Sequence, residues 1–464
     1  MKEISCKLLV IGAGPGGYVC AIRAGQLGID TVIVEAGKPG GTCLTIGCIP
    51  SKALIHAAEE FSTVQRAAAG KNALGISAES PRIDLHATIS WKDGIVGRLT
   101  SGVSSLLQKA RVKIVHGHAR FRDGKTVEVE TETGQQIIRA ETVVISTGSD
   151  PVELPALPFG ERIISSTQAL SLTQLPNKLV VVGGGYIGME LGTAFAKLGS
   201  EVTVVEATGQ VLPLYDADLV KPVIRRFGEL GINLLTNTKA VGLSHQGDAL
   251  IVESSGKRQE FQADKILVAV GRRPRTTGSG LEELDLERAG AYLRIDDRCR
   301  TSMRGIFAIG DVTGEPMLAH RAMAQGEMVA EIIAGKKRAW DKHCIPAICF
   351  TDPEIVTAGL LPDEARSLGF DVKSALFPFT ANGRAMTMQN EDGFVRVVAR
   401  ADTHVILGLQ AVGAGVSELS AAFSIAIEMG ARLEDLAGTI HAHPSRSEAL
   451  QEAALTALRH PLHI

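Results

Sequence analysis

The chain has 464 residues, of which 45% are hydrophobic and 21% charged, and its formal net charge is −3 at pH 7. One hydrophobic core does not grow to this length, so about three domains are expected. The slightly acidic balance argues against nucleic-acid binding, which needs a basic face. No stretch of about 18 apolar residues runs free of Gly or charge, so we expect no membrane-spanning helix. The 50 glycines and only 4% aromatic residues favour an α/β architecture over a sandwich or barrel.

The N-terminus and the cysteines bear on the compartment. The first strand is predicted to begin at Lys7, which leaves Met1 to Cys6 as a leader too short for a signal or transit peptide. The 7 cysteines are odd in number and scattered, apart from one close pair, whereas a secreted disulfide framework is dense and even-numbered. We therefore expect a cytoplasmic protein whose close pair is either one catalytic disulfide or two thiols that never bond.

Residues 7–35 are predicted to form a strand, a glycine turn, a helix and a second strand. Leu8–Ile11 is a continuous apolar run, as in a parallel strand covered on both faces. A GxGxxG turn follows, whose glycines let backbone N–H groups approach a pyrophosphate at a helix N-terminus. The helix is expected over 18–27 and the second strand over 31–34, where Glu35 is placed to accept hydrogen bonds from a ribose. The glycines of this turn are Gly12, Gly14 and Gly17.

Cys43 and Cys48 follow shortly after Glu35, close along the chain to the expected dinucleotide. In a regular helix, Cα atoms five residues apart are separated by about 8.6 Å, which exceeds the limit of roughly 7 Å for a disulfide. A bond between the two therefore needs a distorted backbone, for which the surrounding glycines and Pro50 give reasons. Such a constrained bond would be readily reducible. The CxxxxC spacing is a poor metal motif without a second ligand pair nearby, so no metal site is expected.

Residues 112–145 alternate in polarity and contain turn signals at Asp123-Gly124 and Thr133-Gly134, which predicts β-hairpins. The Pro-rich segment 150–158 then predicts a domain boundary.

Residues 178–206 repeat the first unit, with strands over 178–182 and 201–205 and a helix over 189–198. The chain is thus predicted to carry two dinucleotide folds. Glu206 closes the second strand, and the residues just after it include no Arg for a 2′-phosphate, which favours NAD over NADP. The glycines of the second turn are Gly183, Gly185 and Gly188.

A third apolar strand, over 305–309, ends at Gly310-Asp311. From about residue 345 the pattern changes, and it predicts strands over 346–350, 372–379 and 393–398 and a helix over 417–429.

For five charged or titratable side chains, the residues alone leave two interpretations open. Lys52 and Glu190 lie on the first helical turns after strong turn motifs and are either solvated caps or a buried pair that tunes a cofactor. Asp311 is either a helix cap or a ribitol ligand. His443 and Glu448 belong either to a surface loop or to a general base that a carboxylate orients, which would suit thiol activation.

Together these motifs resemble those of the flavin disulfide reductases, and most closely the branch of that family that oxidises dihydrolipoamide. The resemblance runs over nearly the whole chain. It implies an α/β fold with two Rossmann-like dinucleotide-binding domains and a C-terminal α+β interface domain that forms a homodimer. The implied ranges are 1–149 for FAD binding, 150–276 for NAD binding, 277–345 for a central domain that completes the FAD site, and 346–464 for the interface domain.

The resemblance also implies roles for individual residues. Cys43 and Cys48 would form a redox-active disulfide, in which Cys43 meets the substrate dithiol and Cys48 lies beside the flavin. His443, oriented by Glu448, would act as the base in the site of the partner subunit. Lys52 and Glu190 would pair near the flavin. The implied FAD contacts are Gly12, Gly14, Gly17, Glu35, Thr42, Lys52, Thr147, Gly148, Asp311 and Ala319. The implied NAD contacts are Gly183, Gly185, Ile187, Gly188, Glu206 and Gly271.

The implied reaction is the oxidation of protein-bound dihydrolipoamide to lipoamide with reduction of NAD⁺. The implied partner is the lipoyl domain of an acyltransferase core in a 2-oxo acid dehydrogenase complex. The sequence departs from the family pattern at Thr45-Ile46 and Ser445-Arg446, and neither departure removes a reactive group. Two alternatives remain, namely an NAD(P)H-dependent reductase of another disulfide and a non-catalytic flavoprotein that only binds partners. A long-wavelength absorbance band on titration with dithiothreitol would separate the dithiol enzyme from the latter.

Overall fold

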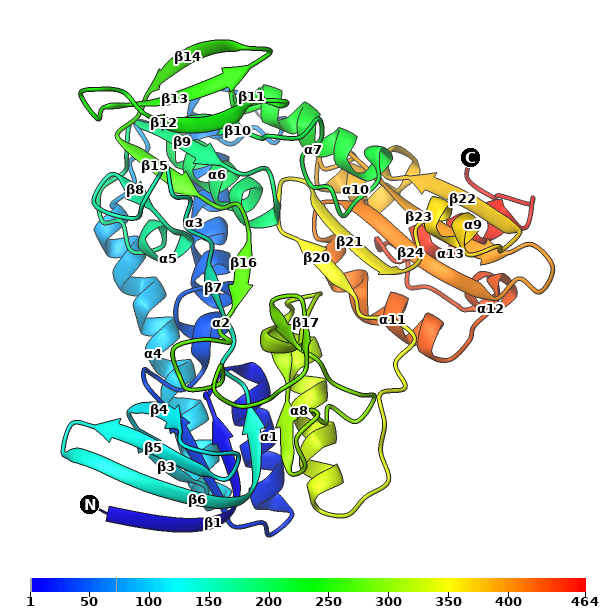
Figure 1. The fold of residues 1–464 in the computed structure, drawn as a ribbon. Coiled ribbons are helices and arrows are strands. Elements are labelled where there is room, and N and C mark those ends of the chain that lie inside the picture. Colours follow the sequence, from blue (N-terminus) through cyan, green and yellow to red (C-terminus); the bar gives the residue numbers. More distant parts are fainter. Residues whose placement is uncertain (1, 72) are drawn as a thin grey trace.

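A seven-stranded sheet forms the lower end of the computed structural model in Figure 1, which describes residues 2–71 and 73–464. Its central strand β1 pairs in parallel with β2 and β6, as expected for buried apolar strands joined by crossovers. The strand order is β3-β2-β1-β6-β5-β4, and β19 adds to β6. The bounds are β1 Lys2–Ile11, β2 Thr31–Glu35, β3 Lys113–His116, β4 His118–Phe121, β5 Thr126–Thr131, β6 Gly134–Ile145 and β19 Ile306–Ala308.

Helices α1 (Pro15–Gln26) and α8 (Ala319–Ile333) share one hydrophobic core with this sheet. They approach so closely that a Cβ atom at Gly326 would lie 2.3 Å from the carbonyl oxygen of Gly16. Glycine is therefore required where the two helices touch. Since β19 and α8 follow the second sheet along the chain, the chain returns to its first unit and completes it.

Two long helices, α3 (Cys48–Ala68) and α4 (Leu85–Lys109), connect the two ends of this part of the molecule (Figure 1). Leu54 and Ala58 of α3 belong to the hydrophobic core of the second unit, where α3 packs beside α6. Of these two helices, only the first turn of α3, around Lys52, is predicted from the sequence. No helix within the described ranges is both long and apolar enough to cross a bilayer.

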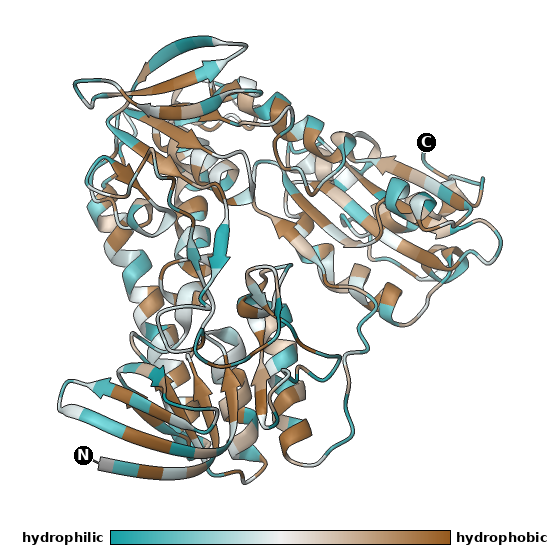
Figure 2. Ribbon diagram, in the orientation of Figure 1, coloured by the Kyte–Doolittle hydropathy of each residue, from teal (hydrophilic) through white to brown (hydrophobic). Residues whose placement is uncertain are grey.

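The second sheet is parallel, with the order β11-β10-β9-β15-β8. An antiparallel sheet of β12, β13 and β14 lies at its outer end (Figure 1), and its strand β14 is mostly polar (Figure 2). The helices of this unit are α5 Ser166–Ala169, α6 Tyr186–Leu198 and α7 Ala217–Glu229. The strands are β8 Ile163–Ile164, β9 Lys178–Val182, β10 Glu201–Val205, β11 Asn233–Leu235, β12 Lys239–Leu243, β13 Ala249–Ser254, β14 Lys257–Gln262 and β15 Lys265–Val268.

Two short antiparallel pairs lie between the larger sheets, as β7 with β16 and β17 with β18. Figure 1 places β7 and β16 in the connection between the first and second units. The bounds are β7 Ser149–Pro151, β16 Arg272–Pro274, β17 Arg288–Ala289 and β18 Tyr292–Leu293, followed by the 3₁₀ turn η1 Gly310–Thr313.

The C-terminal part is an antiparallel sheet with the order β20-β21-β24-β23-β22, covered by helices (Figure 1). Its strands are β20 Ala347–Cys349, β21 Glu354–Gly359, β22 Val372–Pro378, β23 Phe394–Arg400 and β24 Ile406–Gly413. Its helices are α9 Pro362–Ser367, α10 Gly383–Thr387, α11 Ser420–Glu428, α12 Leu433–Gly438 and α13 Glu448–Ala457, with 3₁₀ turns η2 Phe379–Ala381 and η3 Val416–Leu419.

The predicted α/β fold class is confirmed, including two βαβ units of the same pattern and a separate C-terminal α+β layer. The strands predicted over 178–182 and 201–205 have those bounds in the structure. The first strand begins at Lys2 instead of Lys7, because residues 2–6 extend the parallel pairing with β6. The helix predicted over 417–429 is divided into η3 and α11.

Candidate functional site

A cavity of about 780 Å³ opens between the first glycine turn, the start of α3 and the start of α6. Many of the residues singled out from the sequence line it, although they come from distant parts of the chain. They are Gly12, Gly14, Glu35, Thr42, Cys43, Cys48, Lys52, Thr147, Gly148, Ile187, Glu190, Asp311 and Ala319.

The first glycine turn has the shape of a phosphate cradle. Gly12 has φ +96°, and a Cβ there would lie 2.3 Å from the carbonyl oxygen of Ser146. Gly14 caps α1, and a Cβ on it would meet no atom closer than 4.0 Å, so the helix N-terminus faces open space in the cavity. The Oε2 atom of Glu35 accepts the backbone N–H of Ala13 at 2.6 Å, which holds the carboxylate beside the turn. A pyrophosphate fits at this helix end and a ribose at Glu35.

The second turn repeats this construction. Gly183 has φ +110°, and a Cβ there would lie 2.5 Å from the carbonyl oxygen of Ala269. Glu206 accepts the backbone N–H of Gly184 at 2.7 Å, and this pair spans 22 positions, as does the pair of Ala13 with Glu35. Its other oxygen accepts the N–H of Thr208 at 2.7 Å. The two turns therefore hold their carboxylates in the same way, each at the place where a ribose would bind.

Several predicted contacts lie outside the lining of the cavity. Gly17 and Gly188 act within their own turns, since a Cβ on them would come within 1.9 Å and 2.1 Å of the carbonyl oxygens of Gly12 and Gly183. Of the predicted NAD contacts, only Ile187 lines the cavity. The others lie in or near the second glycine turn, outside the lining: Gly183, Gly185, Gly188, Glu206 and Gly271.

The two cysteines stand on different helices with a break between them. Cys43 lies in α2 (Gly41–Thr45), Cys48 begins α3, and Ile46 and Gly47 between them both have φ −141°. The backbone is thus distorted at this point, as a disulfide between them requires. Both are free thiols in the structure, so the disulfide itself stays a prediction.

The two thiols have opposite tendencies to ionise. Hydrogen bonding to Cys48, together with burial, raises the pKa of the Cys43 thiol far above its usual range. The same hydrogen bond, helped by the ammonium of Lys52 and opposed by burial, lowers the pKa of Cys48 to about 7. The pair therefore favours a thiolate on Cys48 and a protonated Cys43.

Lys52 and Glu190 meet at the wall of the cavity. The Lys52 Nζ atom lies 2.8 Å from Oε2 of Glu190, whose side chain is only 4% exposed. Oε1 of Glu190 accepts the backbone N–H of Phe350 at 2.8 Å, and the Lys52 ammonium lies 4.4 Å from the centre of the Phe350 ring. Burial lowers the pKa of Lys52, but the carboxylate of Glu190 outweighs this and raises it. Of the two interpretations left open, the structure supports the pair.

Asp311 lies in η1, and its carboxylate is bound by a residue of β7. Its Oδ2 accepts the hydroxyl of Ser149 at 2.5 Å, and Ser149 accepts Nε of Arg272 at 2.8 Å. Ser149, Arg272 and Tyr186 all line the cavity and were missed by the sequence analysis. These three residues could have been found from their positions in the sequence, because each directly follows or belongs to a recognised motif.

His443 and Glu448 form a pair away from this cavity. Glu448 begins α13, and its Oε1 lies 2.8 Å from Nδ1 of His443, whose side chain is 80% exposed. Oε2 of Glu448 accepts the N–H of Ser445 at 2.7 Å. With Nδ1–H donated to the carboxylate, Nε2 is left as an exposed base. Neither residue lines the cavity of its own chain. The guanidinium of Arg446 stacks 5.1 Å from the ring of Phe379 and leaves this pair untouched.

The comparisons with known proteins agree with this arrangement. The family model described as pyridine nucleotide-disulphide oxidoreductase matches residues 6–326, and its dimerisation domain matches residues 345–454. The dihydrolipoyl dehydrogenase of Pseudomonas aeruginosa is 58% identical over 462 residues, which cover 99% of this chain and 99% of that protein. That of Geobacillus stearothermophilus is 44% identical over 464 residues, covering 99% of this chain and 98% of that protein.

Two solved structures share the fold over nearly the whole chain. The similarity to LpdA from Mycobacterium tuberculosis has a TM-score of 0.88 at 28% identity and covers 97% of this chain and 99% of that one. The similarity to RclA, an HOCl-induced flavoprotein disulfide reductase from Escherichia coli, has a TM-score of 0.85 at 26% identity and the same coverage.

Proposed function

The chain belongs to the pyridine nucleotide-disulphide oxidoreductase family, and we propose that it is a dihydrolipoyl dehydrogenase that uses FAD and NAD⁺. The observation that carries this proposal is the placement of Cys43 and Cys48, on two helices with a distorted backbone between them, in the wall of a dinucleotide cavity. The roles of the other residues follow from their positions around these two cysteines.

The residues of the cavity fit FAD. The N-terminus of α1 at Gly14 would hold the pyrophosphate, Glu35 a ribose, and Asp311 the ribitol. The second turn, with Gly185 and Glu206, would hold NAD⁺ in the same way. When bound, FAD supplies a two-electron acceptor for the dithiol and passes hydride on to NAD⁺.

The protein residues carry the thiol chemistry. In the oxidised enzyme Cys43 and Cys48 form a disulfide, and a thiolate of dihydrolipoamide attacks the Cys43 sulfur. The Cys43–Cys48 bond breaks, a mixed disulfide forms between substrate and Cys43, and Cys48 leaves as a thiolate. The second substrate sulfur then attacks the substrate sulfur bonded to Cys43, which closes lipoamide and leaves Cys43 as a thiol. The lowered pKa of Cys48 makes it the better leaving group.

His443 supplies the base for the substrate thiol. Its Nε2 takes the proton from the attacking thiol while Glu448 holds Nδ1 and stabilises the imidazolium that forms. Because His443 is exposed and outside the lining of its own cavity, it would act on the cavity of the partner subunit in a homodimer. The dimerisation domain that matches residues 345–454 contains it.

The remaining assignments are part of the same proposal. The protein would act in the cytoplasm and take its substrate from the lipoyl domain of an acyltransferase core. The four ranges 1–149, 150–276, 277–345 and 346–464 would be the FAD-binding, NAD-binding, central and interface domains. The sheet topology supports the first three ranges. Strand β19 joins the first sheet, and the second sheet consists of β8, β9, β10, β11 and β15.

The proposal is tested by steady-state assay of the purified protein loaded with FAD. Dihydrolipoamide with NAD⁺ should be oxidised at a rate that Cys43→Ser and Cys48→Ser each reduce by at least about 10³-fold. Wild-type protein that reduces another disulfide with NADPH, yet leaves dihydrolipoamide untouched, would assign a different member of the family. Wild-type protein inactive with every disulfide would favour a binding module.

A further inference from the structure

Helices α3 and α6 are joined by two ion pairs of opposite polarity. Lys52 of α3 contacts Glu190 of α6 at 2.8 Å, and Lys197 of α6 in turn contacts Glu59 of α3. On each helix the two charged residues are seven positions apart, which is two turns, so they share one face. The two helices therefore run side by side and parallel, with the second pair about 10.5 Å along from the first.

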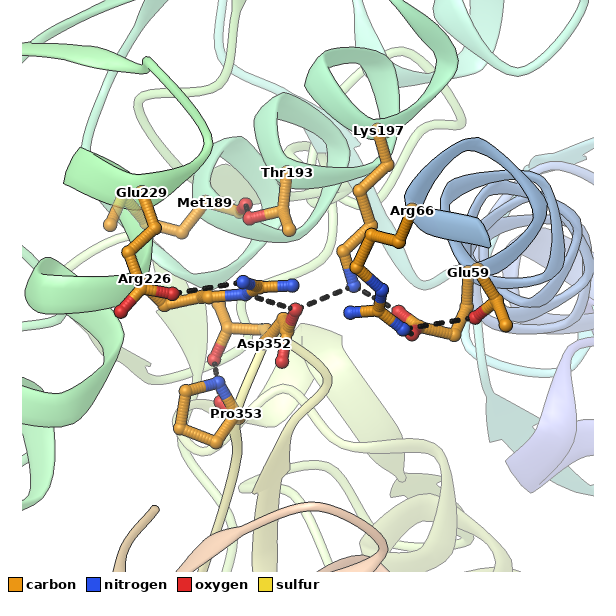
Figure 3. Close-up of polar contacts among 11 residues, drawn as sticks. Glu59, Arg66, Met189, Thr193, Lys197, Arg226, Glu229, Asp352 and Pro353 are labelled. Carbon is orange, nitrogen blue, oxygen red and sulfur yellow. Dashed lines mark hydrogen bonds and ion pairs between the residues drawn. The ribbon is translucent and has the colours of Figure 1, made fainter. Parts of the chain in front are cut away.

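One loop of the C-terminal domain contacts both pairs. It connects β20 to β21, and its Phe350 binds Glu190 and covers the Lys52 ammonium, as described above. Two residues further on, Oδ2 of Asp352 lies 2.8 Å from Nζ of Lys197 and 2.8 Å from Nε of Arg226 (Figure 3). The loop is thus fixed at one end to the cavity wall and at the other to the second ion pair.

Lys197 is the buried member of the second pair, whose Glu59 is 43% exposed, and it shares the carboxylate of Asp352 with Arg226. The side chain of Lys197 is only 5% exposed and those of Arg226 and Asp352 are 18% and 27% exposed. Burial raises the pKa of Asp352, but Lys197 and Arg226 outweigh this and lower it, so the carboxylate stays ionised. A buried ammonium such as that of Lys197 needs its partners, and removal of one is felt by the others.

We propose that Lys197 and Asp352 are positioning residues for the reactive dithiol. By fixing the loop at Asp352, they keep Phe350 against Glu190 and Lys52, and thereby keep the Lys52 ammonium beside Cys48. The inference rests on the proposed function in one respect, that Cys48 is the reactive thiol.

The groups that face Cys48 explain why this position matters. They are Cys43 from α2, Lys52 from its own helix, and Glu190 and Tyr186 from α6, with Asp311 of η1 acting on Cys43. Lys52 favours the Cys48 thiolate and Glu190 opposes it. A small displacement of the ammonium therefore changes the balance between them.

The test is the rate at which iodoacetamide alkylates Cys48 in the reduced, FAD-loaded protein, with the modified residue mapped by mass spectrometry. The rate follows the thiolate fraction. Lys197→Met and Asp352→Asn should each slow alkylation of Cys48 at pH 6 by about threefold or more, which corresponds to an upward pKa shift of about half a unit. Lys197→Arg should restore the rate to within twofold of wild type.

The direction in which each variant shifts the pKa of Cys48 separates positioning from a direct electrostatic effect through space. Lys197→Met removes a positive charge and Asp352→Asn a negative one, so electrostatics through space would move the pKa of Cys48 in opposite directions. Loss of positioning moves it upward in both. Faster alkylation in Asp352→Asn, or an unchanged rate in both variants, would overturn the proposal.

A matched control comes from another contact between the same two domains. Arg225 of α7 lies 2.5 Å from Asp392 of the C-terminal domain, without contact to the loop. Asp392→Asn should leave the alkylation rate unchanged, and a slowing equal to that of Asp352→Asn would count against the proposal. In Lys197→Met, Glu59 keeps its ion pair with Arg66 and Asp352 keeps its ion pair with Arg226. If this variant does not fold, the direction of the change in alkylation rate in Asp352→Asn decides alone.

Failure of this inference and failure of the proposed function are distinguishable. If the wild-type protein does not oxidise dihydrolipoamide but both variants slow alkylation, the function is wrong and the positioning stands. If the enzyme is active and the two variants shift the rate in opposite directions, the function stands and the positioning is wrong.

Discussion

Lys52 and Glu190 form a 2.8 Å ion pair across a distance of 138 positions in the chain, and the backbone of Phe350 binds the other oxygen of the same carboxylate. One carboxylate thereby joins α3, α6 and the C-terminal domain at the wall of the cavity. The negative charge of Glu190 also opposes ionisation of Cys48. The charge of this carboxylate and its hydrogen bonds therefore have separate effects on the pKa of Cys48.

Glu190→Gln should separate these two effects. The amide oxygen can still accept the N–H of Phe350, while the negative charge that raises the pKa of Cys48 is gone. We expect the pKa of Cys48 to fall and alkylation at pH 6 to become about two- to fivefold faster. Slower alkylation in this variant would show that the carboxylate acts mainly by holding Lys52. Lys336→Met is a control, because Lys336 forms an ion pair with Glu331 of α8, at 3.0 Å, in another part of the molecule. The alkylation rate of Cys48 should not change in this variant.

The wild-type protein should show a definite pH dependence. The pKa of Cys48 is lowered from 9.0 to about 7, so the thiolate is present above about pH 7 and is lost as the pH falls through that value. Alkylation of Cys48 in the reduced protein should rise about tenfold per pH unit below pH 6 and level off above pH 8. A rate that keeps rising to pH 9 would mean that neither Cys43 nor Lys52 stabilises the thiolate.

His443→Gln should lower the rate of dihydrolipoamide oxidation by about 10²- to 10⁴-fold, because it removes the base that accepts the substrate proton. The matched control is His404, which also contacts a glutamate, Glu434, at 2.5 Å on the same domain. His404→Gln should keep the rate within twofold of wild type. Activity of His443→Gln within threefold of wild type would remove His443 from the mechanism.

The second dinucleotide site should prefer NAD⁺ over NADP⁺. The carboxylate of Glu206 is fixed by the N–H groups of Gly184 and Thr208 at the place where a ribose would bind, and it would repel a 2′-phosphate. We expect kcat/KM to favour NAD⁺ by at least about tenfold, and Glu206→Gln to narrow that preference. Equal kcat/KM values for the two cofactors in the wild-type protein would contradict this assignment.

The local parts of the site could be predicted from the sequence because their signals are local. A glycine turn between an apolar strand and a helix, with a carboxylate 22 positions after the second turn residue, is complete within about 30 residues, and both copies have the expected form. The break between Cys43 and Cys48 was likewise foreseen from the span between the two residues and the glycines around them.

The contacts between domains could not be predicted in this way. The sequence analysis left Lys52 and Glu190 as either caps or a pair, since only the packing of α3 on α6 brings them together. No role was assigned to Phe350, Lys197 or Asp352, because their contacts depend on the loop between β20 and β21 of the C-terminal domain. Two further site residues were missed because their strand pair is too short to recognise: Ser149, whose hydroxyl donates to Asp311, and Arg272, whose Nε–H donates to Ser149.

Whether electrons pass through a disulfide between Cys43 and Cys48 can be read from the redox state of the two thiols. The purified, air-oxidised protein would be alkylated under denaturing conditions before and after anaerobic reduction with one equivalent of NADH, and the labelled cysteines mapped by mass spectrometry. We expect Cys43 and Cys48 both to resist alkylation before reduction and both to be labelled after it, while the other five cysteines are labelled in each sample. Full labelling of Cys43 and Cys48 in the oxidised protein would contradict electron transfer through a disulfide between them.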